Sequence, residues 1–327
     1  MLQSGFNAIA AAPAAVRTRA RAAPVPREAG RILMRASLRK AILALGWALS
    51  LGGAAQGAGV TLRDDLQRDV TVAQPPRRVV TMLPSLTETV CALDACGRLV
   101  GTDRFSNWPA RVTGLPKAGG LNDAAVEMIV SLKPDLVLLS RSQIITGRLA
   151  ELGVSSFVLE TRTYADIART VRMVGEILGL QERALRLNQT IAEAVRDLAQ
   201  AGRKRNHGDG PSVYFEVDGG PYAAGAASFI GELLNLLGTR NIVTADLGPF
   251  PKLNPEYVVR NDPQVIFTTA AAAAHLEERP GWRGIRAVRE HRVCSFPAAV
   301  SDTIERPGPR VAEGMRALAG CLERVAP

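Results

Sequence analysis

An uninterrupted helical pattern in the middle of the chain constrains the fold more than any other feature. Residues 181–202 (QERALRLNQTIAEAVRDLAQAG) place apolar side chains such as Ile191, Val195 and Leu198 at helical spacing. At ~1.5 Å per residue, a helix of this length spans roughly 33 Å. Patterns that alternate between strand and helix flank it on both sides. We therefore expect one long helix that joins two α/β parts.

Strand and helix patterns alternate through the segment that precedes this helix. Runs rich in β-branched and aliphatic residues, such as RVVTMLP at 78–84 and DLVLLS at 135–140, predict strands. Amphipathic runs, such as 125–133 and 164–179, predict helices. A short hairpin is expected before them, at 60–72. This alternation predicts βαβ units and a mainly parallel sheet.

The chain after the long helix repeats this organisation. The polar stretch RKRNHGDGP (203–211) is expected to end the helix in a solvated turn, after which the alternation resumes. EMIVSLKPDLVLL (127–139) and EYVVRNDPQVIFT (256–268) share a Glu, two apolar residues, a Pro and an apolar strand at an offset of 129 residues. This echo supports two similar lobes. We expect a leader at 1–57, an N-terminal lobe at 58–180, a connecting helix at 181–203 and a C-terminal lobe at 204–327.

The N-terminus carries the features of an export signal. From Met34, MRASLRK supplies a positive region, AILALGWALSL (41–51) an apolar one, and GGAAQGAG the small residues that favour cleavage. The apolar run is shorter than the ~20 residues that span a bilayer. We expect a cleaved signal at 34–57 and a periplasmic protein, with an uncleaved membrane anchor as the alternative. Residues 1–33 show no apolar periodicity, so Met34 is the expected start.

The charge of the chain is concentrated in this leader. Residues 1–57 hold eight Arg or Lys and one acid, which is +7 of the total +9 and leaves +2 for the rest. Because the body is nearly neutral, the basic composition does not indicate a nucleic-acid partner.

Four cysteines in an exported protein indicate disulfides, because the compartment is oxidising. Four cysteines allow three pairings, and we favour Cys91 with Cys96 and Cys294 with Cys321. A bridge across five residues requires the helix that holds Cys91 to end before Cys96. Gly97 is the expected stop signal.

The same helix, SLTETVCALDA, has an N-terminal capping pattern. Ser85 or Thr87 is expected at its start, with Glu88 in its first turn.

The chain shows no pattern of a catalytic or metal site. G-x-S-x-G, Walker and G-x-G-x-x-G motifs are all missing from the sequence. His207, His275 and His291 show no metal-ligand spacing with one another or with the cysteines. We therefore expect no enzyme and no resident metal or cofactor. A periplasmic metal-dependent hydrolase is the remote alternative, and a lobed protein that captures and releases a ligand is the expectation.

Two aromatic residues stand in a predicted surface loop of a chain with only 5% aromatics. GTDRFSNWP, residues 101–109, places Phe105 and Trp108 directly after a strand. Loops lie against water and are normally polar. These rings therefore predict either a platform for a ligand or a staple that holds the loop on its lobe.

The phrase RVVTMLPSLTETVCAL…RLVGTDRFSNWP…VEMIVSLKPDLVLL resembles a known family, the periplasmic solute-binding proteins of ABC importers that carry cobalamin, haem and iron siderophores. The resemblance covers roughly residues 60–325, and the cobalamin binders are the most similar branch. It implies two Rossmann-like lobes bridged by one α-helix, with the ligand held between them. At GGLND (119–123) the chain departs from the cobalamin binders, which carry a Trp there.

The resemblance also implies where the ligand binds. The loop at 101–109, the segments GGPYAAG and LGPFPKLNPE, and the turn in SDTIERPGPR match ligand-contacting parts of the family. Flat rings suit the broad apolar faces of a corrin. As alternatives, the loop rings staple the loop, and the acid and arginine of the turn form a local salt bridge. The implied contacts are Phe105, Trp108, Tyr222, Phe250, Asp302 and Arg306.

Two acids are implied to dock on the membrane permease. Glu127 and Glu256 match the surface Glu of each lobe in the family and are related by the offset of 129 residues. Equivalent acids on two similar lobes suit a partner with two-fold symmetry. Each Glu also lies in the first turn of a predicted helix, where an acid favours the helix dipole.

The function that the resemblance implies is capture of cobalamin, or a related corrinoid, and its delivery to an inner-membrane ABC permease. The protein is expected to be a monomer. Haem and ferric siderophores are the alternative ligands. Haem would use Tyr222 on its iron, and an anionic siderophore would use Arg104 and Arg306.

Overall fold

The computed structural model describes residues 59–72, 75–143, 145–206 and 210–325. The expected leader at 1–57 lies outside the described residues. Within the described part, no helix is both long and apolar enough to cross a membrane. Residues 59–180 are called the N-terminal half below, and residues 210–325 the C-terminal half.

The N-terminal half is built on a four-stranded parallel sheet with the order β4-β3-β5-β6. An antiparallel hairpin of β1 (Val60–Arg63) and β2 (Asp69–Val72) precedes it, as expected. The strands are β3 (Val79–Thr81), β4 (Leu99–Thr102), β5 (Leu136–Leu139) and β6 (Ser156–Val158), and the helices are α2 (Pro84–Ala92), α3 (Val126–Ser131), α4 (Thr146–Glu151) and α5 (Tyr164–Leu178).

The C-terminal half has a second, separate sheet, in which β10, β7 and β11 run parallel and β8 pairs with β7 in the opposite direction. The strands are β7 (Ser212–Val217), β8 (Tyr222–Ala223), β9 (Arg240–Asn241), β10 (Val265–Thr269) and β11 (Val293–Phe296), and the helices are α7 (Phe229–Leu236), α8 (Pro255–Asn261), α9 (Ala270–Ala273), α10 (Arg286–Arg289), α11 (Ala298–Glu305) and α12 (Val311–Val325).

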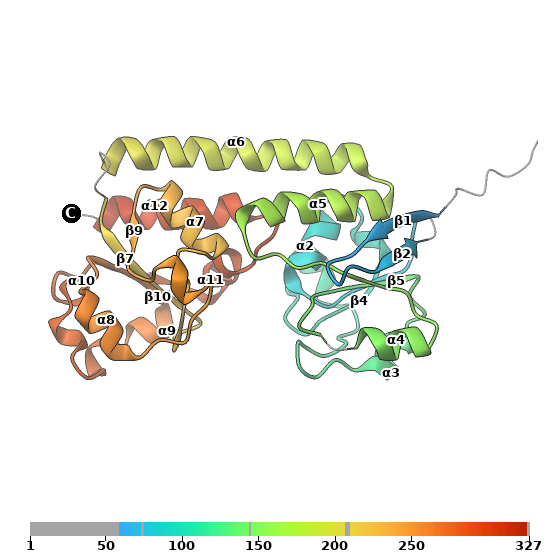
Figure 1. Ribbon diagram of the computed structural model, residues 1–327, viewed down its shortest axis with the longest axis horizontal. Coiled ribbons are helices and arrows are strands. Elements are labelled where there is room, and N and C mark those ends of the chain that lie inside the picture. The colour runs from blue at the N-terminus through green and yellow to red at the C-terminus, as the bar shows by residue number, and fades with distance from the viewer. Residues whose placement is uncertain (1–58, 73–74, 144, 207–209, 326–327) are drawn as a thin grey trace, which may run out of the picture. The chain divides into compact units, whose positions relative to one another are not determined.

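The long helix α6 (Gln181–Asn206) belongs to the cores of both halves. Ala184 is buried in the core of the N-terminal half, and Ile191 and Val195 are buried in that of the C-terminal half. The helix packs along α5 and α12 (Figure 1). It extends to Asn206, beyond the expected end at 203, because the basic run Arg203–Arg205 lies in its last turn, where cations suit the helix dipole.

Helix α2 differs from expectation at both ends. Its N-cap is Leu83, which offers no side-chain cap, and Pro84 occupies the first position, where its missing N–H is tolerated. The predicted capping role of Ser85 and Thr87 is therefore wrong. At the other end, the residue with left-handed backbone is Asp94, at φ 61°, whereas Gly97 lies in a following 3₁₀ turn.

Both predicted disulfides are confirmed. Cys91 and Cys96 are bridged with their Cα atoms 4.2 Å apart, because α2 ends between them. Cys294 and Cys321 are bridged across 5.8 Å and join β11 to α12.

We expect the two disulfides to differ in their effect on stability. In the chain-entropy model, the loop of 27 residues closed by Cys294–Cys321 contributes about 3.5 kcal/mol, and the loop of five residues closed by Cys91–Cys96 about 2 kcal/mol. The double Ala variants of each pair, compared by urea unfolding, should show this order. An equal or reversed order would contradict it.

Candidate functional site

Two adjoining hollows lie where residues of both halves meet. The larger measures about 460 Å³ and the smaller about 270 Å³. The N-terminal half contributes the start of α2 and the segment before α3, and the C-terminal half contributes the end of α11. The residues common to both linings are Leu83, Pro84, Leu121, Glu305 and Arg306. Leu121 lies in the GGLND segment and is 43% exposed, so an aliphatic side chain stands where the cobalamin binders were expected to have a ring.

The aromatic loop after β4 has its polar side chains inside and its rings outside. Asp103 and Ser106 are 1% and 2% exposed, whereas Phe105 and Trp108 are 57% and 40% exposed. The loop can therefore carry exposed rings, because its polar residues form its internal support. The rings are thereby left on the surface.

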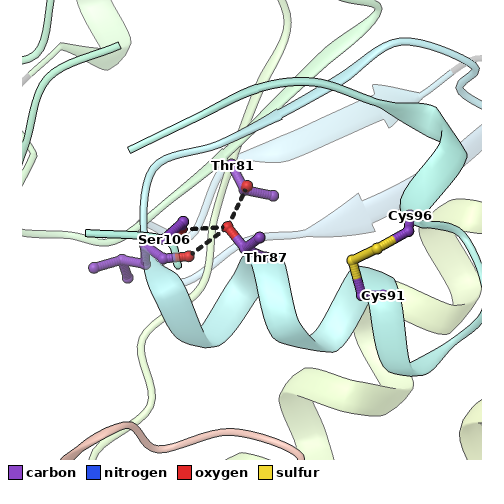
Figure 2. Close-up of a disulfide and its surroundings, with 6 residues drawn as sticks. Thr81, Thr87, Cys91, Cys96 and Ser106 are labelled. Atoms are coloured by element: carbon purple, nitrogen blue, oxygen red, sulfur yellow. Dashed lines mark hydrogen bonds between the residues drawn. A yellow bond between two sulfur atoms is a disulfide. The ribbon is translucent and has the colours of Figure 1, made fainter. Parts of the chain in front are cut away.

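A chain of hydroxyl groups connects this loop to α2 and β3. Thr87 Oγ1 on α2 is 2.7 Å from Ser106 Oγ and 2.7 Å from Thr81 Oγ1 on β3 (Figure 2). Ser106 Oγ in turn donates to Asp103, whose Oδ2 accepts the backbone N–H of Phe105 at 2.8 Å. The Cys91–Cys96 bridge closes the other end of the same helix (Figure 2).

Lys117 fastens the same loop with its ammonium group. Nζ donates to Thr102 Oγ1 at 2.9 Å and to the Ser106 carbonyl at 2.7 Å. Burial lowers the pKa of Lys117, and the charge of Asp103 opposes that shift. Burial likewise raises the pKa of Asp103, against its hydrogen bonds from Ser106 and Phe105 and the charge of Lys117. The loop is therefore held by buried polar contacts.

Three of the six expected ligand residues come together at the larger hollow, namely Phe105, Asp302 and Arg306. The expected turn at SDTIERPGPR is wrong in part: Asp302 lies on α11, and Arg306 is the residue that ends this helix. The two side chains also form the local salt bridge considered above, at 2.8 Å.

Trp108 does not line either hollow. Its ring instead lies against the guanidinium of Arg310, whose carbon is 4.4 Å from the ring centroid. The two rings of the loop therefore have different surroundings. Trp108 ties the loop to the C-terminal half, and Phe105 faces the larger hollow.

Tyr222 and Phe250 are not part of the lining of either hollow. Tyr222 is 48% exposed on β8 and pairs with Val217, which does line the larger one. Tyr222 also forms an isolated β-bridge with Lys252. Phe250 is 39% exposed, and its ring centroid lies 6.4 Å from that of Phe229.

The two acids expected to dock on the permease occupy equivalent places. Glu127 lies in the first turn of α3, which leads to β5, and Glu256 in the first turn of α8, which leads to β10. Both are exposed, and neither forms a salt bridge with any described residue. Their helical positions agree with the expected dipole role.

Sequence reasoning missed Glu88 and Arg310 as parts of this region. Glu88 was expected to serve the start of α2, but it is 1% exposed and its carboxylate receives Arg306 and Arg310. The one available signal for Glu88 is its place within a helix segment, Ser85 through Val90, in which every residue is buried. An acid in such a segment needs a partner. Nothing local identifies its partners.

The described residues contain no group of three or more His, Cys, Asp or Glu side chains arranged to hold a metal ion.

Two α/β halves joined by a helix, with a hollow lined from both, define a ligand-binding protein. A family model described as periplasmic binding protein matches residues 79–300, and the chain belongs to this family. Its relatives are substrate-binding proteins of ABC transporters rather than enzymes, so the hydrolase alternative is set aside. Membership places the protein in the periplasm or outside the cell.

Curated relatives cover most of the chain. An uncharacterized ABC transporter substrate-binding lipoprotein of Bacillus subtilis, YvrC, is 30% identical over 269 residues, which is 80% of this chain and 84% of that protein. A cobalamin-binding protein of Halobacterium salinarum is 28% identical over 277 residues, or 80% of this chain and 74% of that protein.

Solved structures show the same fold. The periplasmic vitamin B12 binding protein BtuF of Vibrio cholerae superposes with a TM-score of 0.67 at 22% identity, covering 77% of this chain and 98% of that one. A periplasmic haem-binding protein of Pseudomonas aeruginosa gives 0.66 at 25% identity, covering 77% and 94%. The expected fold of two α/β lobes joined by a long helix is thus confirmed.

Glu305, in the lining of both hollows, makes the stability dependent on pH. Burial raises its pKa to about 7, and the charges of Asp218 and Asp302 add to the shift. Between the ordinary pKa of 4.5 and about 7, the folded protein keeps a proton that the unfolded chain has lost. Its contribution to stability is therefore greatest at low pH and falls as the pH rises through this window.

We expect Glu305→Gln to gain stability relative to the parent protein as the pH is raised from 5 to 8, measured by thermal unfolding. Glu313→Gln, an exposed acid on α12, is the matched control and should show no such trend. A difference between Glu305→Gln and parent that stays constant with pH would contradict the raised pKa.

Proposed function

We propose that this protein captures cobalamin or a related corrinoid and delivers it to an ABC permease of the inner membrane. Two kinds of observation support the ligand class. Cobalamin-binding and vitamin B12-binding proteins are among its relatives, at 24% to 28% identity. The hollows combine exposed apolar groups such as Phe105 and Leu121 with polar groups, which suits a broad ligand with apolar faces and a polar edge.

The charge of the lining distinguishes best among the candidate ligands. The one guanidinium in the lining of these two hollows, Arg306, is already paired with Glu88 and Asp302. Like charges placed together oppose binding, so the lining disfavours the carboxylates of haem and an anionic ferric siderophore. It suits the amide groups on the edge of a corrinoid, which donate hydrogen bonds to carboxylates. Of the acids in the two linings, Asp103 is bonded within its loop, and Glu160 and Asp302 pair with arginines. Asp218 and Glu305 are left to face a ligand.

The positions of the aromatic residues agree with this choice. Haem capture would need a Tyr or His that reaches the iron, and Tyr222 is not part of the lining of either hollow. We assign Phe105 to the wall of the ligand site and Trp108, Tyr222 and Phe250 to its surroundings, where their exposed rings extend the apolar surface that a bulky ligand covers.

The proposed transport cycle needs a leader and a docking surface. The segment 34–57 would direct export and be removed, and the mature protein would act as a monomer in the periplasm. Glu127 and Glu256 would then meet basic residues of the permease, one on each half of a two-fold symmetric partner. Their exposure and equivalent places in the two halves support this role.

The ligand is tested by titrating the purified protein with cobalamin, haem and a ferric hydroxamate while Trp fluorescence is followed. Saturable quenching is expected with cobalamin. Phe105→Ala should weaken binding by about tenfold, or ~1.4 kcal/mol, because the ring loses its contact with the ligand. Leu185→Ala, which removes an equally exposed apolar side chain on α6, should leave the affinity unchanged. Saturation by haem or the ferric hydroxamate, with no response to cobalamin, would make that compound the assigned ligand.

Docking is tested by the double variant Glu127→Arg and Glu256→Arg. Uptake of cobalamin by cells that express the cognate permease should fall to the background level, because like charges would meet at the interface. The affinity for cobalamin should be unaffected. Glu193→Arg, at an exposed site on α6, is the control and should transport normally. Normal uptake by the double variant would remove these acids from the docking surface.

A further inference from the structure

Glu88 is a buried acid that receives two arginines from the other half of the protein. Arg310 donates from Nε to Oε2 at 2.9 Å and from Nη2 to Oε1 at 2.7 Å, which is a two-pronged contact. Arg306 donates from Nη1 to the same Oε1 at 3.0 Å. The partners are 218 and 222 residues away along the chain, so this cluster links the two halves.

Both arginines continue from Glu88 to the aromatic loop. The guanidinium of Arg310 lies against the ring of Trp108. Arg306 donates from Nη1 to Asn107 Oδ1 at 2.8 Å and from Nη2 to the carbonyl of Phe105 at 3.2 Å. One carboxylate on α2 thus anchors two arginines that contact this loop from the C-terminal half, where Asp302 Oδ2 also accepts from Asn107 Nδ2 at 2.9 Å.

Two acids and two arginines balance the charges of this cluster. Glu88 and Asp302 face Arg306 and Arg310, and both arginine side chains are 11% exposed. Without the charge of Glu88, two largely buried guanidiniums would share one acid, and removing one partner of such a cluster leaves a charge uncompensated. The arginines would then be expected to turn toward water and to release the loop.

The backbone also requires the two halves to be close at this point. Gly308 lies between the two arginines, and a Cβ atom there would come within 3.3 Å of the Ser85 side chain and 3.4 Å of its Cα at the start of α2. This close approach lets both arginines reach Glu88.

We infer that Glu88 is a positioning residue of the ligand site. It lines neither hollow, whereas Arg306 lines both and Phe105 lines the larger one. It acts through Arg306 and Arg310, which fix the loop that presents Phe105 to the ligand. This inference rests on the proposed function for the ligand, but its effect on the loop is measurable without any ligand.

The first test measures the accessibility of Trp108 in the ligand-free protein. In the full chain with Trp47→Phe, the remaining tryptophans are Trp108, which is 40% exposed, and Trp282, which is 1% exposed, so acrylamide quenching reports mainly on Trp108. Glu88→Gln should raise the quenching constant by about twofold, because the guanidinium no longer covers one face of the ring. The control is Asp64→Asn.

Asp64 is a matched control because it is 2% exposed and receives Nε and Nη2 of Arg68 at 3.0 and 2.6 Å, but makes no contact with the loop. Asp64→Asn should lose thermal stability while its quenching constant stays at the parent value. Quenching that is unchanged in Glu88→Gln, or raised equally in Asp64→Asn, overturns the inference. If Glu88→Gln does not fold, Arg310→Lys takes its place, and its quenching constant is compared with those of the parent protein and Asp64→Asn. Arg310→Lys loses both the two-pronged contact with Glu88 and the planar stacking on Trp108.

The second test uses cobalamin. Glu88→Gln should weaken binding by about tenfold, and Asp64→Asn should not. In combination with Phe105→Ala the effects should be less than additive, because both changes act through the same loop. Full additivity overturns the positioning role. If the parent protein binds none of cobalamin, haem and ferric hydroxamate, the proposed function fails, whereas the quenching comparison still decides whether Glu88 positions the loop.

Discussion

The two halves of this protein share one helix, and the rest of the structure depends on that sharing. Ala184 of α6 is buried in one core, whereas Ile191, Val195 and Ala199 are buried in the other. A continuous α-helix does not bend sharply without losing backbone hydrogen bonds. The two sheets are therefore held at fixed places along one helix, and the groups that face each other between them have a defined spacing.

The aromatic loop uses this fixed spacing. Its internal support comes from the N-terminal half, through the hydroxyl groups of Thr81, Thr87 and Ser106. Its outer contacts come from the C-terminal half, through Asp302, Arg306 and Arg310. A loop held from two sides keeps its rings exposed without collapsing onto a core. Holding exposed rings in place before binding reduces the entropy that the ligand would otherwise have to overcome.

The electrostatics of the site separate structural charges from ligand-facing ones. Arg306 is paired with Glu88 and Asp302 even though it lines both hollows. Asp218 and Glu305 lie in the lining without an arginine partner in the described salt bridges, and burial keeps the pKa of Glu305 near 7. Under the proposed function, a lining of this kind favours a ligand that donates hydrogen bonds over one that carries negative charge.

The sequence by itself indicated most of the strands and helices, the disulfide pairing and the two α/β parts around α6, because apolar periodicity, Pro, Gly and the close spacing of Cys91 and Cys96 act over a few residues or one element. It also indicated Phe105 as an exposed ring. Only the tertiary structure decided that Trp108 stacks on Arg310 and that Glu88 serves Arg306 rather than the start of α2. These contacts join residues about 200 positions apart, and a local pattern carries no record of which side chains the fold will bring together.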